Sequence, residues 1–379
     1  MGYASVKKPA FYIPFLDYSH SIGEIKNVEF TYQQWDTAVP YEKISSSHLL
    51  NPTNYMKIPW EDTGGEFNNE GLMYTLEFEV SVPTEDLVDE NGDIFIYALG
   101  HNFHTLDVAF TVRFWEFDGT QIPTSQRESL VNDSESEFTA PSFNGWSAYK
   151  TQQEEGWSIN KITFEILFGG FDNGNGENPS FVNETDIIIG SWGIYSKWTP
   201  PHNPDLSIKM NRIFDGVNTV TTKGGSTLTQ TNYTQPARWG TANAWQLTTN
   251  SYPADLLPQS QGMLNRDGTL GRKTWDMKFS YLTKDDFMPK LEAMNSYESE
   301  YYDTEEEDSA KLQRNQSFLG RVLNRVQGGR LPFIFQPNIT DPNNNPDQFS
   351  IVRFDQQTFS AEQLAPDLYA ISLKLKETW

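Results

Sequence analysis

Two histidines three residues apart are the first candidates for chemistry in this sequence. His101 and His104 follow the apolar run 94–99, and imidazole nitrogens are common zinc ligands. That run has the pattern of a β-strand, on which residues three apart point to opposite faces. The other histidines, His20, His48 and His202, lie far away in the sequence. We interpret the pair as turn residues at a strand end and predict no metal site.

Two acidic segments have the oxygen ligands that calcium prefers. Residues 172–177 read Asp-Asn-Gly-Asn-Gly-Glu, which does not match the EF-hand spacing, and a Gly/Asn-rich turn explains the same residues. Residues 89–93 contain Asn91-Gly92, a signal for a hairpin turn. We interpret both segments as turns, and the sequence predicts no cofactor.

Several tryptophans could form a platform for a sugar ring. Trp146 and Trp157 each follow a glycine, and Trp192 and Trp198 come later in the same half of the chain. Tryptophan side chains also fill the interiors of β-sandwiches. Trp146 and Trp157 are therefore candidates for glycan stacking, with core packing as the alternative.

The motifs of the common enzyme classes are absent from the sequence. It has no Walker loop, no dinucleotide fingerprint and no Gly-x-Ser-x-Gly elbow. A pair of carboxylates at glycosidase separation is expected by chance among 51 Asp and Glu, so it carries no information. We predict a protein that is not an enzyme.

Composition favours a mainly β chain. The 379 residues include 25 Phe, 17 Tyr and 11 Trp, with 26 Gly and 21 Pro, which is typical of short strands joined by turns. A chain of this length predicts two or three domains. The lack of cysteine excludes disulfides and thiolate chemistry. No segment has the pattern of a signal peptide, a myristoylation site or a membrane helix, so we expect a soluble protein without a membrane partner.

The negative charge is concentrated in the first half. Residues 1–204 contain 10 Lys and Arg against 30 Asp and Glu, a net charge of −20, whereas residues 205–379 contain 18 against 21, a net charge of −3. An acidic surface repels nucleic acid, and a nearly neutral one docks more easily onto protein. We expect the first half to be exposed and the second half to be the attached part.

The first half shows the alternation of a β-sandwich. Runs 72–82, 94–99, 108–117 and 159–168 read as strands separated by polar loops, which predicts a jelly-roll-like sandwich over 71–200. Residues 1–70 form an N-terminal segment that is either part of this sandwich or an arm. Three prolines within residues 200–204 predict a boundary.

The second domain, 205–379, is predicted to contain an antiparallel sheet and one main helix. Expected strands cover 206–214, 217–223, 274–282, 331–337 and 349–355. Helices are expected near 285–295 and 310–327. The second helix has an apolar stripe, an arginine face that contains Arg321 and Arg325 and that we expect to be solvated, and a Gly328-Gly329 stop.

The last eleven residues alternate between apolar and polar side chains. Tyr369, Ile371, Leu373 and Leu375 share one side, which predicts a half-buried strand that ends near Trp379. Free chain ends normally fray, so we expect this strand to be held in its own sheet or by a neighbour.

These segments resemble virion structural proteins of tailed bacteriophages, in particular tail and baseplate components. The resemblance lies in 98–103, 187–247 and 271–282, and in the C-terminal order of a Trp-x-Met-x-Phe strand, a helix, Gly-Gly-x-Leu-Pro-Phe-Ile-Phe, an Arg-Phe-Asp strand and a closing strand. This C-terminal order is similar to distal-tail and minor-tail proteins. The resemblance covers most of the chain from about residue 94 and leaves 1–70 unmatched.

The resemblance implies a structural adaptor that forms a homo-oligomeric ring. Its C-terminal domain would be related in shape to tail-tube modules, and its outer domain would be a jelly roll. Expected partners are other tail or baseplate proteins and not nucleic acid, in the virion tail after synthesis in the host cytoplasm. The alternative is a carbohydrate-binding module that contacts host glycans. Candidate interface residues are Leu373, Leu375, Trp379, Arg321, Arg325, Lys223 and Arg238.

Overall fold

The protein is mainly β, as its composition predicts. The computed structural model describes residues 6–25, 28–34, 37–41, 56–58, 73–83, 87–89, 91–103, 108–123, 125–129, 146–152, 157–168, 187–213, 217–231, 272–288, 317–340 and 349–378. The strands of the first half are β1 (Ala10–Pro14), β2 (Val28–Gln34), β3 (Thr37–Tyr41), β4 (Met56–Ile58), β5 (Met73–Pro83), β6 (Asp93–Leu99), β7 (Val108–Trp115), β8 (Ser125–Ser129), β9 (Trp146–Gln152), β10 (Ser158–Phe168), β11 (Ile187–Ile189) and β12 (Ser191–Trp198).

The second half has strands and short helices. Its strands are β13 (Lys209–Ile213), β14 (Val217–Thr221), β15 (Thr227–Thr231), β16 (Arg272–Thr283), β17 (Phe333–Gln336), β18 (Ser350–Phe354), β19 (Ala361–Ala365) and β20 (Leu368–Glu377). The helices of the described chain are α1 (Phe15–Ser21), α2 (Lys284–Phe287), the π-helix η4 (Phe318–Asn324) and the 3₁₀ turn η5 (Gln327–Gly329). Each strand predicted in this half overlaps a strand of the structure, with shorter bounds for β13, β14, β17 and β18 and longer bounds for β16.

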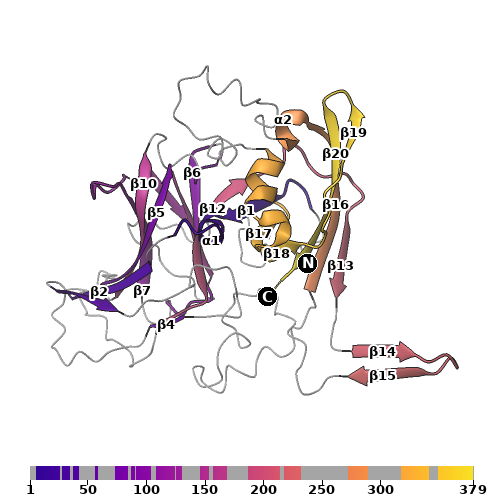
Figure 1. Cartoon of the computed structure of the whole chain (residues 1–379), viewed down its shortest axis with the longest axis horizontal. Helices are drawn as coiled ribbons and strands as arrows, with labels where there is room; N and C mark the ends of the chain where they lie inside the picture. The colour runs from indigo at the N-terminus through magenta and orange to yellow at the C-terminus, as the bar shows by residue number, and fades with distance from the viewer. Residues whose placement is uncertain are drawn as a thin grey trace.

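One 11-stranded antiparallel sheet runs through both halves of the chain. Its order is β13-β16-β20-β18-β17-β1-β12-β6-β9-β8, and β19 pairs with β20. The joining strand is β1, which pairs with β12 of the first half and with β17 of the second half. The proline-rich segment follows β12 at Trp198. The same sheet nevertheless contains strands that come before this segment in the sequence and strands that come after it (Figure 1). The division into domains at 71–200 and 205–379 stays a prediction.

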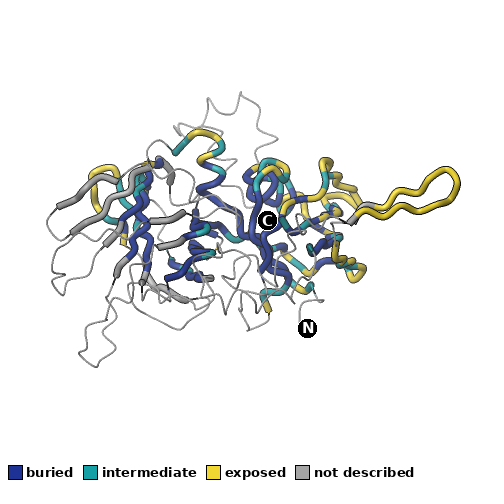
Figure 2. Tube along the Cα trace, turned by 90° about the horizontal axis from the view of Figure 1, so that it is seen from below, coloured by how far each residue is buried: buried dark blue, intermediate teal, exposed yellow. Residues whose placement is uncertain are grey.

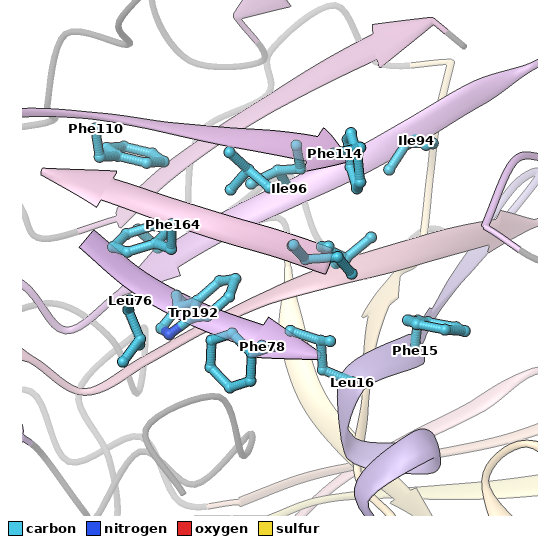
Figure 3. Packing of buried hydrophobic residues seen from close by; sticks show 14 of the residues in the cluster. Phe15, Leu16, Leu76, Phe78, Ile94, Ile96, Phe110, Phe114, Phe164 and Trp192 are labelled. Atoms are coloured by element: carbon cyan, nitrogen blue, oxygen red, sulfur yellow. The ribbon is translucent and has the colours of Figure 1, made fainter. Parts of the chain in front are cut away.

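The first half is a β-sandwich. A five-stranded sheet, β3-β2-β5-β10-β7, faces the β6 and β12 part of the long sheet (Figure 1). Trp192 of β12 lies between the sheets, with its ring centroid 4.9 Å from that of Phe78 and 4.6 Å from that of Phe164 (Figure 3). Burial of one large apolar side chain of this kind contributes about 1.5–3 kcal/mol.

A second core holds the helix η4 against the C-terminal part of the long sheet. Phe318 and Val322 of η4 pack with Trp275 of β16 and Leu373 and Leu375 of β20. The strand β1 contributes to this core through Phe11 and Ile13, whereas its Tyr12 side chain lies in a third cluster on the opposite face. Residues 10–14 are therefore a central strand of the long sheet, not an arm.

The helix predicted near 285–295 is wrong in its length, because α2 ends at Phe287 and the backbone of Met288 is extended, with φ −102° and ψ 141°. Thr283 caps α2: its hydroxyl accepts from the backbone N–H of Asp286, whose side chain accepts from the backbone N–H of Thr283. This capping box explains why the helix begins here. The remainder of this predicted helix, and the first residues of the one predicted over 310–327, lie outside the described residues.

Candidate assembly interface

A two-stranded hairpin projects from the second half of the molecule. Its strands β14 and β15 pair with each other and form a separate two-stranded sheet. In the turn, the Thr222 N–H donates to the Ser226 carbonyl at 2.8 Å, and Gly225 has φ +83°, which favours glycine. Figures 1 and 2 show this hairpin as an arm that extends away from the body, with its residues exposed.

The arm exposes apolar side chains that a body-packed hairpin would bury. Val220 and Leu228 lie opposite each other in the strand register, and their exposed fractions are 63% and 62%. Thr and Val favour extended backbone, but an isolated two-stranded hairpin is at best marginally stable in water. The arm is therefore the described part of the chain that would gain most from contact with another surface.

The strand β13, which precedes the arm, forms an edge of the long sheet. Among the described strands it pairs only with β16, and Lys209, Asn211, Arg212 and Ile213 are all exposed. Edge strands leave backbone N–H and C=O groups free to pair with another chain. The edge and the arm are consecutive in sequence, so together they form one continuous candidate contact region.

The terminal strand is held within its own sheet. β20 lies between β16 and β18, and its alternation is as predicted, with Ile371, Leu373 and Leu375 facing the second core. The prediction that Leu373 and Leu375 contact another subunit is wrong, because their exposed fractions are 1% and 0%. Trp379 lies outside the described residues.

Arg321 and Arg325 are buried, which corrects both the expectation of a solvated arginine face and their assignment to an interface. Their exposed fractions are 0% and 1%. The Arg321 guanidinium donates to the backbone carbonyl of Val88, in the loop before β6. Nearby, Gln327 Nε2 donates to Ser21 Oγ of α1 at 2.5 Å. The helix thus has first-half elements on its polar side, and its arginines bind within the chain.

Two interface candidates remain, Lys223 and Arg238. Lys223 lies in the exposed turn of the β14–β15 arm, which is consistent with contact to another molecule. Arg238 lies outside the described residues, so its role stays a prediction.

The tryptophans considered as a glycan platform are mostly core residues. Trp192 and Trp198 belong to the two main cores, which confirms the alternative for these two. Trp157 is partly buried and packs against the first core. Trp146 begins β9, and its side chain is outside the description. The described tryptophans therefore form no exposed platform, and glycan binding stays a prediction.

The residues considered for metal binding have structural roles where the structure describes them. His101 is buried, its Nε2 lies 2.9 Å from Ser147 Oγ, and its ring stacks on Phe103. Asp89 Oδ1 accepts from the backbone N–H groups of Asn91 and Asp93, which confirms a turn at 89–93. His104 and residues 172–177 lie outside the described residues. Within the described part of the chain, no three His, Asp or Glu residues are grouped so as to hold a metal ion.

Buried ionisable groups cluster near the middle of the long sheet. Burial raises the pKa of the hydroxyls of Tyr12, Tyr97 and Tyr195. Tyr12 Oη donates to Gln336 Oε1 at 2.8 Å, and the Tyr97 and Tyr195 rings meet edge to face. These tyrosines therefore stay neutral near neutral pH and pack in the interior, where Tyr12 also donates its hydrogen bond.

One buried carboxylate lies near the end of β20. Burial raises the pKa of Glu377, and the neighbouring Lys273 partly opposes this effect. Glu377 Oε2 accepts from the backbone N–H of Lys273 at 2.9 Å, and Oε1 lies 3.9 Å from Lys273 Nζ. This pair joins the ends of β16 and β20, which strengthens the structural role of the terminal strand.

No protein-family model, curated protein or solved structure matches the chain. Among the described helices, none has the length and apolar content needed to cross a bilayer. The arm and the adjoining sheet edge are therefore the features on which an assignment of function can rest.

Proposed function

We propose that this protein is a non-enzymatic structural component of a bacteriophage tail or baseplate, which assembles into a ring or adaptor through its C-terminal half. The observation that carries the proposal is the exposed β14–β15 arm. It is a hairpin that pairs with no other described strand and presents Val220 and Leu228 to solvent. An arm of this kind gains its stabilising contacts from a neighbouring subunit.

The open edge at β13 supports the same proposal. A neighbouring strand that paired with this edge would extend the long sheet by backbone hydrogen bonds, a common way for β proteins to associate. The exposed Ile213 side chain, with an exposed fraction of 38%, would be covered at the same contact. The uneven charge supports an acidic first half that projects from the assembly, because its net charge of −20 opposes close packing of like surfaces.

Removal of the arm tests this function. A variant in which residues 217–231 are replaced by a short Gly-Ser linker keeps every core residue described above. We expect it to unfold at the same urea concentration as the parent chain but to be missing from particles when it replaces the parent protein during phage production. Western blotting of purified particles measures incorporation.

A matched pair of substitutions tests the apolar face of the arm. Val220→Thr with Leu228→Thr keeps strand-forming residues but removes the exposed apolar pair, so we expect reduced incorporation. Thr219→Ser with Thr229→Ser changes the opposite face at the neighbouring register position and should leave incorporation unchanged. Normal incorporation of the chain that lacks the arm would refute the proposed role of the arm.

A further inference from the structure

The outer face of the C-terminal sheet carries a group of cations that the core does not explain. On β20, Lys374 and Lys376 point away from Leu373 and Leu375. In the register, Lys376 lies opposite Arg353 of β18, and Lys374 lies opposite Asp276 of β16, which in turn lies opposite Lys209 of β13. We call Lys209, Arg353, Lys374 and Lys376 the basic face.

One pair within the basic face is electrostatically unfavourable in the free chain, whereas Asp276 lies between Lys209 and Lys374 in the register. Arg353 and Lys376 are directly opposite each other, and like charges in that arrangement destabilise a sheet. Among the described residues, no carboxylate lies within ion-pair distance of these four cations. Asp276 and Asp355 are the nearest acids in the register, and Glu362 instead pairs with Lys278 at 3.6 Å. The exposed side chains of Lys209, Arg353 and Lys374 are thus available to an acidic partner.

An acidic turn with an exposed aromatic ring lies at the end of β7. Phe117 has an exposed fraction of 89% and stands between Glu116 and Asp118. The turn is well ordered: the Glu116 N–H donates to the Thr120 carbonyl at 2.9 Å, and the Thr120 N–H donates to Asp118 Oδ1 at 2.8 Å. The hydrogen bond from Thr120 lowers the pKa of Asp118, so this carboxylate is ionised at neutral pH. Exposed aromatic side chains are frequent anchors of protein interfaces.

The acidic turn and the basic face cannot meet within one chain. β7 lies in the sandwich of the first half, whereas β13, β16 and β20 lie at the opposite side of the molecule (Figure 1). We propose that the acidic turn 116–119 of one copy docks on the basic face of a second copy, with the Phe117 ring against the cationic side chains. This contact is head-to-tail, so its repetition produces a closed ring or an open filament.

Charge complementarity favours a second copy over nucleic acid as the partner. The first half of the chain has a net charge of −20, and the whole chain has a net charge of −23, which repels a polyanion such as DNA at long range. A second copy instead brings an acidic half to a locally basic surface. The inference rests on the proposed function, because it names the contact through which copies of the chain would form a ring.

A charge exchange between the two surfaces tests the contact. The first variant reverses the basic face by Lys374→Glu and Lys376→Glu. The second changes the turn by Glu116→Lys and Asp118→Asn, since asparagine keeps an acceptor for the Thr120 N–H. The third combines all four substitutions in one chain. Sedimentation velocity over a range of protein and salt concentrations measures the association of each full-length chain.

We expect the parent chain to associate more weakly as the salt concentration rises, because exposed charges are screened. The first and second variants should each lose at least about tenfold in association constant, roughly the effect of one good contact. The combined variant should recover most of this loss. The control, Lys284→Glu with Arg330→Glu, makes the same charge change at exposed residues outside the basic face and should associate like the parent.

Three results would overturn the inference. The first is a parent chain that stays monomeric at every concentration. The second is loss of association in both single-surface variants without recovery in the combined variant, which would show that the acidic turn and the basic face do not contact each other. The third is binding of duplex DNA by the parent that disappears in Lys374→Glu with Lys376→Glu. A different result would refute the proposed function, namely the formation of normal particles from chains that lack the arm.

Discussion

At the residue scale, the buried arginines are the main departure from what the sequence predicts. Arg321 and Arg325 follow helical spacing, and arginine on a helix is normally solvated, so sequence alone favours an exposed stripe. The structure buries them because η4 lies between the C-terminal sheet and first-half segments that are about 230 residues away in sequence. Periodicity reports which residues share a helix face, but it does not report how many neighbours the helix has.

Arg321→Ala is expected to destabilise the fold strongly. The substitution leaves a cavity and removes the donor to the Val88 carbonyl, and such losses cost about 3 kcal/mol or more. Arg330→Ala, on an exposed arginine of the following turn, should change the free energy of unfolding by less than about 0.5 kcal/mol. Urea unfolding of both variants measures the difference, and equal midpoints would contradict the structural role of Arg321.

Glu377 is expected to make stability depend on pH. Because burial raises the pKa of Glu377 in the folded state, ionisation of this group is harder in the folded chain than in the unfolded chain. Its favourable contribution is present below the ordinary Glu pKa and is lost as the pH rises through the raised pKa.

The glutamine in the variant Glu377→Gln cannot ionise. Its contribution to the free energy of unfolding therefore does not fall as the pH rises. The free energy of unfolding of the parent, relative to Glu377→Gln, should fall as the pH rises from about 4 to 7. Urea unfolding at several pH values measures this difference. A difference that is constant or that rises with pH would show that the carboxylate is stabilised in its charged form.

At the element scale, strands with one buried face were predicted well. The alternation of Ile371, Leu373 and Leu375 with polar neighbours is visible in the sequence and holds in β20. The strand β1 was not predicted, since all five residues of Ala10–Pro14 are buried and a strand covered on both faces shows no clear alternation. The predicted strand at 217–223 corresponds to β14, the first strand of the arm. The separation of the arm from the body could not be predicted, because it depends on tertiary structure.

The glycine pair after the helix gives a matched test of the second core. Gly328 and Gly329 both have positive φ, +65° and +101°, but only Gly329 is crowded. A Cβ on Gly329 would lie 3.0 Å from the Phe354 Cβ and 3.2 Å from its carbonyl oxygen, whereas a Cβ on Gly328 would meet no atom within 4 Å. The backbone of η5 therefore has to approach β18 closely.

Gly329→Ala should cost roughly 2–4 kcal/mol, because it combines backbone strain with a steric clash. Gly328→Ala should cost about 1 kcal/mol, the penalty for a left-handed residue with a side chain. Thermal or urea unfolding measures both. If Gly328→Ala were as damaging as Gly329→Ala, the close approach to Phe354 would not be the cause.

At the scale of the whole molecule, one sheet connects an acidic sandwich to a half that offers an arm, an open edge and a basic face. The mainly β class followed from composition, but the connection did not, because β1 is buried on both faces and shows no alternation in the sequence. The candidate interface in the structure also differs from the one that the sequence predicts. Sequence reasoning favoured the apolar side of the terminal strand and the arginine face of η4, both of which are buried, and of its candidates only Lys223 of the arm is exposed in the described chain.

We propose that this chain acts as a part of a larger particle through surfaces of its C-terminal half. Cryo-electron microscopy of purified phage particles, with the chain located in the density, is the decisive measurement. We expect copies in a ring, with residues 217–231 of each copy in contact with a neighbouring chain. Particles without this protein, or copies whose arms point into solvent with no neighbour, would contradict it.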